Sequence, residues 1–303
     1  MPQAIKTETF DYVFDDVKDY INWIYFFHSW QFPPAYAAIA DLGTGDEARG
    51  RWLASLPEGD AERGKAAITL YDEAMRVIAD DGGRSRVRFR YALYAANSDG
   101  DDIVLRDGRR IPFLRQQLPG KDGYCLCLAD YLSPAGSGTE DTLGVFAATI
   151  ASGMGRDDAD GDAYCHFMSQ TLAERMVEAA VEKSHQRVRR EGWGYAHGER
   201  LSRQELLAER YQGIRPAVGY PSIPDQSINF IIDELLDLGS VGIALTDNGA
   251  MSPAASVDGF MFANANSRYF NIGDITDEQL HDYAARRGID TASVRKFLAR
   301  CTI

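Results

Sequence analysis

The 303-residue chain has little of what marks secreted, membrane-spanning or nucleic-acid-binding proteins. Its four cysteines are too few for a disulfide framework in a chain of this size. Its net charge of −13 excludes the basic excess that nucleic acids and anionic membranes attract. No apolar run approaches the ~20 residues needed to span a bilayer, and residues 1–8 lack the apolar core of a signal peptide. We therefore expect a cytoplasmic protein with neither nucleic acid nor membrane as partner.

The sequence also lacks the signals of a self-contained catalytic centre. None of its five histidines falls into a paired spacing for metal ligands, and no nucleophile elbow is present. Cys125 and Cys127 form a C-x-C pair without a second pair, which is poor spacing for zinc. We therefore predict no catalytic residue and no metal site, and a chain that binds and presents something.

One glycine-rich segment, Asp41-Leu42-Gly43-Thr44-Gly45-Asp46, resembles the first loop of Rossmann-like methyltransferases. That loop must follow a buried strand and open a helix. Residues 33–40, however, are typical of a helix, and no third glycine stands at the usual spacing. We therefore predict a surface turn here.

Hydrophobic periodicity predicts an α+β fold, because the strands cluster instead of alternating regularly with helices. Helices are expected at 15–31, 36–56 (as short pieces), 60–80, 160–191, 203–211, 226–237, 276–287 and 291–299. Strands are expected at 86–94, 103–105, 110–114, 124–131, 143–151, 257–263 and 268–273. Cys125 and Cys127 would share one face of the strand 124–131 as reduced, structural thiols.

The segment from Arg215 to Pro224 reads as a stiff, built loop. Its three prolines fix φ and remove backbone donors, so the loop loses little entropy on ordering. Gly219 permits a positive φ or a close approach, Arg215 offers a fork of donors for a carboxylate, and Tyr220 offers an aromatic face. Two interpretations remain open: a loop that binds a small zwitterionic ligand, or a corner whose arginine pairs with a nearby carboxylate.

The helix expected at 160–191 carries Glu174, Glu178 and Glu182, each four residues from the next and so on one face. Like charges at this spacing repel one another weakly. The stripe is either a solvated acidic face or a set of carboxylates facing a cationic ligand or partner.

Eight separated segments occur together in a characteristic order. They are Tyr20–Trp30, Ala96–Ile103, Leu114–Gln117, Cys127–Tyr131, Trp193–Ala196, Tyr211–Pro221, Leu245–Gly259 and Tyr269–Phe270. Together they make the chain resemble the C-terminal activation domain of cobalamin-dependent methionine synthase, from about residue 20 to about residue 300.

The resemblance implies a single C-shaped α+β domain over residues 20–303, with a central antiparallel sheet, surrounding helices and an N-terminal extension at 1–19. In that family the domain binds S-adenosylmethionine and docks over cobalamin when the cofactor has been oxidised to Co(II). An electron from a flavodoxin-type donor and a methyl group from S-adenosylmethionine then restore methylcobalamin.

The resemblance also implies the site residues. Those matching S-adenosylmethionine-binding positions are Asn22, Glu178, Arg215, Ala217, Gly219, Tyr220, Tyr269 and Phe270. Among them Arg215 would hold the ligand's carboxylate, while Ala217 and Gly219 would meet the ligand through their main chain. Glu174 matches a position that faces the cobalamin domain. Asn22 stands where the family usually has an aspartate.

These implications lead to one expected function. We expect a stand-alone activation subunit of a split methionine synthase, because the sequence lacks the Asp-x-His-x-x-Gly cobalamin motif and the homocysteine and folate modules. It would bind S-adenosylmethionine, act on cobalamin carried by a partner chain, and have no methionine synthase activity alone. The alternatives are a docking module that has lost the ligand, and a reactivation partner of another corrinoid methyltransferase.

Overall fold

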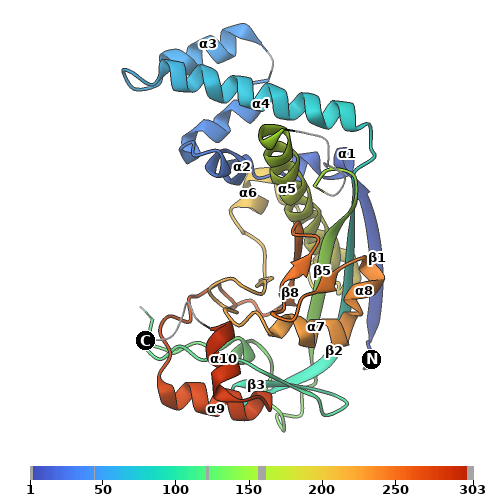
Figure 1. Cartoon of the computed structure of the whole chain (residues 1–303). Coiled ribbons are helices and arrows are strands. Elements are labelled where there is room, and N and C mark those ends of the chain that lie inside the picture. The colour runs from blue at the N-terminus through green and yellow to red at the C-terminus, as the bar shows by residue number, and fades with distance from the viewer. Residues whose placement is uncertain (1–2, 44, 121–122, 156–161, 299–303) are drawn as a thin grey trace. The chain divides into compact units, whose positions relative to one another are not determined.

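The computed structural model describes residues 3–43, 45–120, 123–155 and 162–298 (Figure 1). The chain divides into two compact units. The larger comprises Met1–Phe10, Arg88–Thr149 and Ser184–Ile303, and the smaller comprises Asp11–Val87 and Ile150–Lys183. The chain crosses between the units within β1 (Lys6–Val13), β2 (Arg86–Asp99), β5 (Asp141–Ser152) and α5 (Ala163–Arg187), so neither unit is a continuous piece of sequence.

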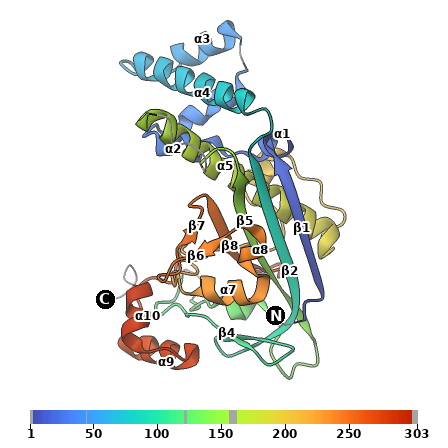
Figure 2. The same cartoon turned by 45° about the vertical axis from the view of Figure 1, so that its right-hand side comes forward.

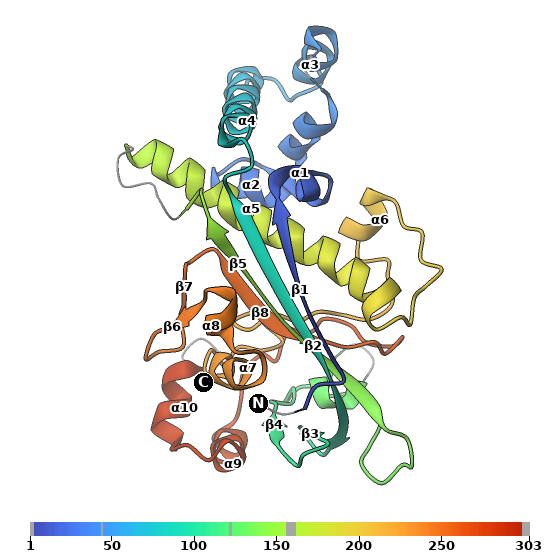
Figure 3. The same ribbon diagram turned by 90° about the vertical axis from the view of Figure 1, so that its right-hand side faces the viewer.

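The main sheet has the strand order β4-β3-β2-β5-β8, and β1 also pairs with β2 (Figures 2 and 3). Its other strands are β3 (Asp102–Leu105), β4 (Arg110–Pro112) and β8 (Ser256–Met261). The pairs β2–β3, β3–β4 and β5–β8 are antiparallel, which confirms the predicted antiparallel sheet. The tight turn between β2 and β3 places Gly100 at φ 63°, a conformation that glycine adopts without strain. β6 (Ala244–Leu245) and β7 (Met251–Ser252) pair separately.

The larger unit is held together by two apolar clusters. In the first, α7 (Ile228–Leu236) buries Ile228, Ile232 and Leu235, whose spacing places them on one helical face, together with side chains of β2, β3, β5 and β8. The second joins α9 (Asp277–Arg287) and α10 (Thr291–Phe297) to Ile272 and Ile275. The unit also contains the 3-10 helix η3 (Leu128–Tyr131), the π-helical turn η4 (Val188–Gly192), α6 (Arg203–Leu207) and α8 (Leu238–Val241).

The smaller unit is mostly helical. Besides the ends of β1, β2 and β5 and the part of α5 that it contains, its elements are α1 (Phe14–Val17), the 3-10 helix η1 (Lys18–Tyr20), α2 (Trp23–Ser29), the 3-10 helix η2 (Pro34–Asp41), α3 (Asp46–Ala54) and α4 (Ala61–Asp81). The continuous helix predicted at 15–31 is wrong, because the chain breaks at Ile21 and Asn22. Asn22 has an extended backbone, and its Oδ1 accepts a hydrogen bond of 3.1 Å from the Ile24 N–H. Asn22 is therefore the N-cap of α2, and the new helix begins at Trp23.

The strand predicted at 124–131 is also wrong. Asp130 accepts a hydrogen bond of 2.9 Å from the Cys127 N–H, which begins η3 and diverts the chain from an extended path. Cys127 is buried and Cys125 is half-buried, so the two do not share a strand face, although both thiols are free. Residues 268–273 form no strand either, and most of the hydrogen bonds to their backbone come from side chains.

Most other sequence expectations are confirmed. The helices at 60–80, 226–237, 276–287 and 291–299 and the strands at 143–151 and 257–263 correspond to α4, α7, α9, α10, β5 and β8. The segment Asp41–Asp46 joins the last residue of η2 to the first of α3, so a 3-10 helix and not a strand precedes it, and Thr44 lies outside the described residues. The strand β1 was not predicted. It lies in residues 1–19, which the sequence analysis treats as an N-terminal extension. No helix in the described part of the chain is long and apolar enough to cross a membrane.

Candidate functional site

The loop from Arg215 to Pro224 begins as an irregular neighbour of β8. Ile214 and Phe262 exchange two backbone hydrogen bonds of 3.0 and 2.9 Å. Further along, the Phe260 N–H donates to the Pro216 carbonyl at 3.0 Å, and the Val218 N–H donates to the Asp258 carbonyl at 3.1 Å. The first half of the loop is therefore fixed to the edge of the main sheet.

Gly259 of β8 permits this close approach. A Cβ at this position would lie 2.2 Å from the Pro216 carbonyl oxygen and 2.8 Å from the Ala217 Cα. Because backbone atoms cannot move aside cheaply, any side chain here would force the loop away from the strand. Gly259 is therefore part of the scaffold that places Ala217.

The second half of the loop turns outward at Gly219. Gly219 has φ +85°, and its N–H donates to the Ile223 carbonyl at 2.8 Å. No heavy atom lies within 4 Å of a Cβ built on Gly219, so the space beside its backbone is open. The ring of Tyr220, the next residue, is 56% exposed. This end of the loop thus presents backbone and an aromatic face to its surroundings.

A second segment, residues 268–272, is joined to the loop by hydrogen bonds. The Arg215 N–H donates to the Tyr269 hydroxyl at 3.0 Å, and the Ile272 N–H donates to the Pro221 carbonyl at 3.0 Å. Between them, the Ser222 hydroxyl donates to the Phe270 carbonyl and accepts from the Phe270 N–H at 3.2 Å. The two segments therefore form one structural element within the larger unit.

The two aromatic residues of the second segment differ in their surroundings. Tyr269 is 38% exposed. Phe270 packs partly buried against both apolar clusters, and its ring centroid lies 6.4 Å from that of Tyr131. Packing accounts for Phe270, whose expected ligand contact stays a prediction.

The positive charge of Arg215 acts on a buried histidine. His185 is buried, and its pKa is lowered well below 6.5 by burial and by the positive charges of Arg189 and Arg215. Arg189 Nη1 lies 2.7 Å from His185 Nδ1, and because a guanidinium can only donate, the imidazole accepts there as a neutral ring. A neutral histidine adds no further positive charge beside Arg215.

The charge of Arg189 is matched by Glu199. Its Nε and Nη2 donate to the two Glu199 carboxylate oxygens at 2.8 and 2.7 Å, and its guanidinium lies 3.9 Å from the Tyr211 ring centroid. This bidentate pair is buried at the start of the segment that leads to Arg215. The pair therefore fixes the chain shortly before the loop Arg215–Pro224.

The acidic residues predicted for the site belong to the smaller unit. Glu174 and Glu178 are half-buried on α5, and Glu174 lies 3.8 Å from the Arg175 guanidinium. Glu182 is only 6% exposed, so the stripe is not a uniformly solvated face. Asn22 serves as the N-cap of α2.

The structure thus brings part of the predicted set together. The residues that lie in the two joined segments are Arg215, Ala217, Gly219, Tyr220, Tyr269 and Phe270. Sequence reasoning assigned no role to Ser222, Gly259 or Tyr131. Each of the three lies within or next to one of the eight segments that carry the family resemblance, but the residues that it contacts are distant in sequence. Within the described residues, no group of three or more His, Cys, Asp or Glu side chains could hold a metal ion.

Two comparisons relate this geometry to known proteins. A family model described as vitamin B12 dependent methionine synthase, activation domain, matches residues 13–288. Among solved structures, the chain is similar to the crystal structure of the MetH reactivation domain bound to AdoHcy, with a TM-score of 0.84 and 32% sequence identity. That match covers 99% of this chain and 91% of the other.

Proposed function

Because the chain belongs to the activation-domain family of vitamin B12-dependent methionine synthase, we propose that it binds S-adenosylmethionine and supports the reductive methylation of cobalamin. In this proposal, the loop Arg215–Pro224 and the segment 268–272 belong to the ligand site. The related MetH reactivation domain binds AdoHcy, which is S-adenosylmethionine without its transferable methyl group.

The observation that best supports the proposal is the fixed backbone around Arg215. Pro216 and Val218 are bonded to β8, and the Arg215 N–H is bonded to Tyr269, so the guanidinium starts from a rigid base. A preorganised cation suits a carboxylate, since less entropy is lost when the ligand binds. The open space at Gly219 and the exposed ring of Tyr220 fit a ligand that meets main chain and aromatic faces.

The chemistry proposed for this chain is positioning. When bound, S-adenosylmethionine supplies the methyl group, and its sulfonium is attracted to aromatic faces such as those of Tyr220 and Tyr269. Methyl transfer needs alignment of donor and acceptor and no general base on this chain. Glu178 and Asn22 remain predicted ligand contacts, and Glu174 remains a predicted contact for the cobalamin domain.

The first test is titration of the purified protein with S-adenosylmethionine. We expect Arg215→Ala to weaken binding by about 2 to 4 kcal/mol, because a charge-assisted contact is lost and a carboxylate is left unpaired. Isothermal titration calorimetry measures the difference. Arg210→Ala removes the same charge from an exposed position five residues earlier and serves as the matched control.

Each outcome of this titration is informative. Equal losses in the Arg210 and Arg215 variants would show that net charge matters and that no specific contact exists. No detectable heat from the wild-type protein at millimolar ligand would favour a docking module without the ligand.

A second prediction concerns Asn22. We expect Asn22→Asp to tighten S-adenosylmethionine binding by about 1 to 2 kcal/mol, because the carboxylate restores a charge-assisted bond to the ligand. Aspartate caps helices as well as asparagine does, so α2 should keep its start at Trp23. Asn22→Ser, which keeps a capping oxygen without the charge, is the control. Unchanged affinity in the aspartate variant would mean that this family contact is absent here.

The proposed activity in trans has its own test. In the assay, a cobalamin-binding methionine synthase subunit from the same organism supplies the cofactor in its Co(II) state. With S-adenosylmethionine and a flavodoxin-type reductant, we expect the cobalamin absorption spectrum to change to the methylated form only when this chain is present. The chain alone should not methylate homocysteine.

The rate in this assay should change as salt is added, because the chain's net charge of −13 acts on docking through interactions that are screened beyond about 8 to 10 Å. Identical spectra with and without this chain, using a partner shown to be competent, would rule out the activation role. Reactivation of a different corrinoid methyltransferase in the same assay would instead support the alternative partner.

A further inference from the structure

The segment that carries Tyr269 belongs to no helix or strand, yet side chains hold it at two points. The first is Arg268, where the Tyr131 hydroxyl donates to the carbonyl at 2.9 Å and accepts from the N–H at 3.3 Å. Burial raises the pKa of Tyr131, so its hydroxyl keeps the proton that it donates. One hydroxyl therefore fixes both backbone groups of the residue before Tyr269.

The second point is Asn271, two residues after Tyr269. The side-chain amide of Gln116 donates to the Asn271 carbonyl at 2.7 Å. Its Oε1 accepts from the Leu126 N–H at 3.0 Å, and the Gln116 N–H donates to the Leu126 carbonyl at 3.0 Å. Gln116 is thus fixed at both ends and connects Leu126 to the Tyr269 segment.

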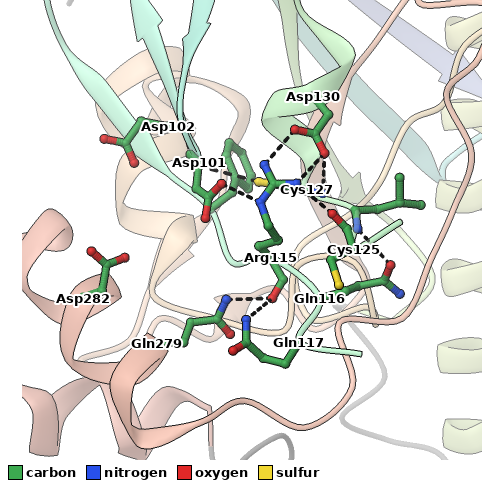
Figure 4. Close-up of polar contacts among 12 residues, drawn as sticks. Asp101, Asp102, Arg115, Gln116, Gln117, Cys125, Cys127, Asp130, Gln279 and Asp282 are labelled. Atoms are coloured by element: carbon green, nitrogen blue, oxygen red, sulfur yellow. Dashed lines mark hydrogen bonds and ion pairs between the residues drawn. The ribbon is translucent and has the colours of Figure 1, made fainter. Parts of the chain in front are cut away.

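Both points of attachment depend on Arg115, which lies at the centre of Figure 4. Its guanidinium pairs with both carboxylate oxygens of Asp130 at 2.7 and 2.8 Å, with Asp101 at 2.7 Å and with the Cys125 carbonyl at 2.7 Å. These bonds fix η3, which ends at Tyr131, and they fix the backbone next to Gln116.

Two further side chains hold the backbone at the same residue. The Arg115 carbonyl accepts hydrogen bonds from the Gln279 and Gln117 amides at 2.6 and 3.2 Å (Figure 4). The hydroxyl of Thr276 in turn donates to the Gln117 side chain at 3.2 Å. The loop around Arg115 is therefore also tied to the start of α9, just beyond the Tyr269 segment.

We propose that Tyr131 and Gln116 are positioning residues for the ligand site: they hold Arg268 and Asn271, and thereby keep the Tyr269 hydroxyl where it accepts the Arg215 N–H. This inference rests on the proposed function for its consequence, because it gives the two residues an effect on S-adenosylmethionine affinity. The positioning itself is a property of the unliganded protein and can be measured without ligand.

The competing explanation is that Tyr131 only stabilises the core, and Tyr94 separates the two explanations. Both tyrosines belong to the first apolar cluster, and each donates its hydroxyl to a backbone carbonyl. The acceptor for Tyr94 is Leu235 in α7, which lies in neither joined segment. Tyr94→Phe therefore removes a comparable buried hydroxyl without touching the Tyr269 segment.

The experiment measures amide hydrogen exchange and ligand affinity in Tyr131→Phe, Gln116→Glu and Tyr94→Phe. Gln116→Glu keeps the acceptor for Leu126 and loses the donor to Asn271. We expect the first two variants to speed exchange at the Arg215 and Phe270 amides and to weaken S-adenosylmethionine binding roughly two- to tenfold per lost hydrogen bond. Tyr94→Phe should leave both quantities unchanged.

A double-mutant cycle tests whether the effect passes through Tyr269. Tyr269→Phe keeps the ring and removes the acceptor for the Arg215 N–H. If Tyr131 acts by placing that hydroxyl, Tyr131→Phe should lower affinity less in the Tyr269→Phe background than in the wild type.

Three results would overturn the inference: unchanged exchange at the Arg215 and Phe270 amides in Tyr131→Phe, an equal effect of Tyr94→Phe, or strict additivity in the cycle. If the wild-type protein bound no S-adenosylmethionine, the proposed function would fail, while hydrogen exchange would still decide whether Tyr131 and Gln116 hold the segment.

Discussion

Asp258→Asn should stabilise the folded protein, by an amount that grows as the pH rises from about 4 to about 8. Asp258 lies in β8 with a fully buried side chain, and neither carboxylate oxygen has a hydrogen-bond partner among the described residues. Burial alone raises its pKa from 3.8 to about 8, because a charge is costly in a medium that cannot solvate it. Asparagine has almost the same shape and never ionises.

The direction follows from proton binding. Between about pH 4 and pH 8 the folded wild type keeps a proton on Asp258 that the unfolded chain has released. The wild type therefore loses stability relative to the variant as the pH rises through this window, and the loss levels off above about pH 8. One pKa unit corresponds to about 1.4 kcal/mol, so the full difference approaches about 6 kcal/mol as an upper limit.

Urea unfolding of both proteins at pH 5, 6, 7, 8 and 9 checks this expectation. Asp247→Asn, on the surface of the same unit, controls for the loss of one negative charge. A stability difference between the Asp258 variant and the wild type that is the same at pH 5 and pH 9 would contradict it. The backbone carbonyl of Asp258 also accepts a hydrogen bond from the Val218 N–H. Ionisation of the Asp258 side chain therefore affects the strand to which the candidate ligand loop is bonded.

The sequence predicted those features that depend on local pattern. The helices α4, α7 and α9 follow from apolar spacing, and the Arg215–Pro224 loop follows from its prolines and Gly219. The resemblance drawn from eight ordered segments is confirmed by the family match over residues 13–288. The α+β class with an antiparallel sheet is confirmed as well.

Features that depend on long-range polar contacts could not be predicted. η3 replaces the expected strand because Asp130 bonds both Cys127 nearby and Arg115, 15 residues away in sequence. Ser222 and Tyr131 acquire their roles from partners 48 and 137 residues distant. Periodicity carries no information about such pairs, since a serine or tyrosine in a loop looks the same whether or not its hydroxyl is bonded.

Burial of charged groups in the larger unit could not be predicted either. Asp258 lies in β8 next to the apolar Val257, and Arg189 lies in a basic run that usually marks an exposed helix end. Burial of such groups depends on a partner or a shifted pKa, and neither can be read from composition. Asp258 is buried with a raised pKa, and Arg189 is buried in a pair with Glu199.

Arg189→Met and Glu199→Leu should each destabilise the protein by about 3 to 5 kcal/mol, because each leaves the other charge buried and unpaired. The side chains of Arg189 and Glu199 are 0% and 7% exposed, so water cannot compensate for the missing partner. The double variant, with two apolar side chains in place of the pair, should recover most of the loss. Chemical unfolding of all four proteins gives the coupling energy directly.

The control is Arg187→Met, which removes an exposed arginine whose guanidinium lies over the Phe10 ring, 4.0 Å from its centroid. We expect this variant to lose less than about 1 kcal/mol, as exposed charges usually do. Arg189→Met should also raise the pKa of His185, since one of the two cations that lower it is gone. If the double variant were as unstable as the sum of the singles, the pair would not act as a unit, and the anchoring role given to it would be wrong.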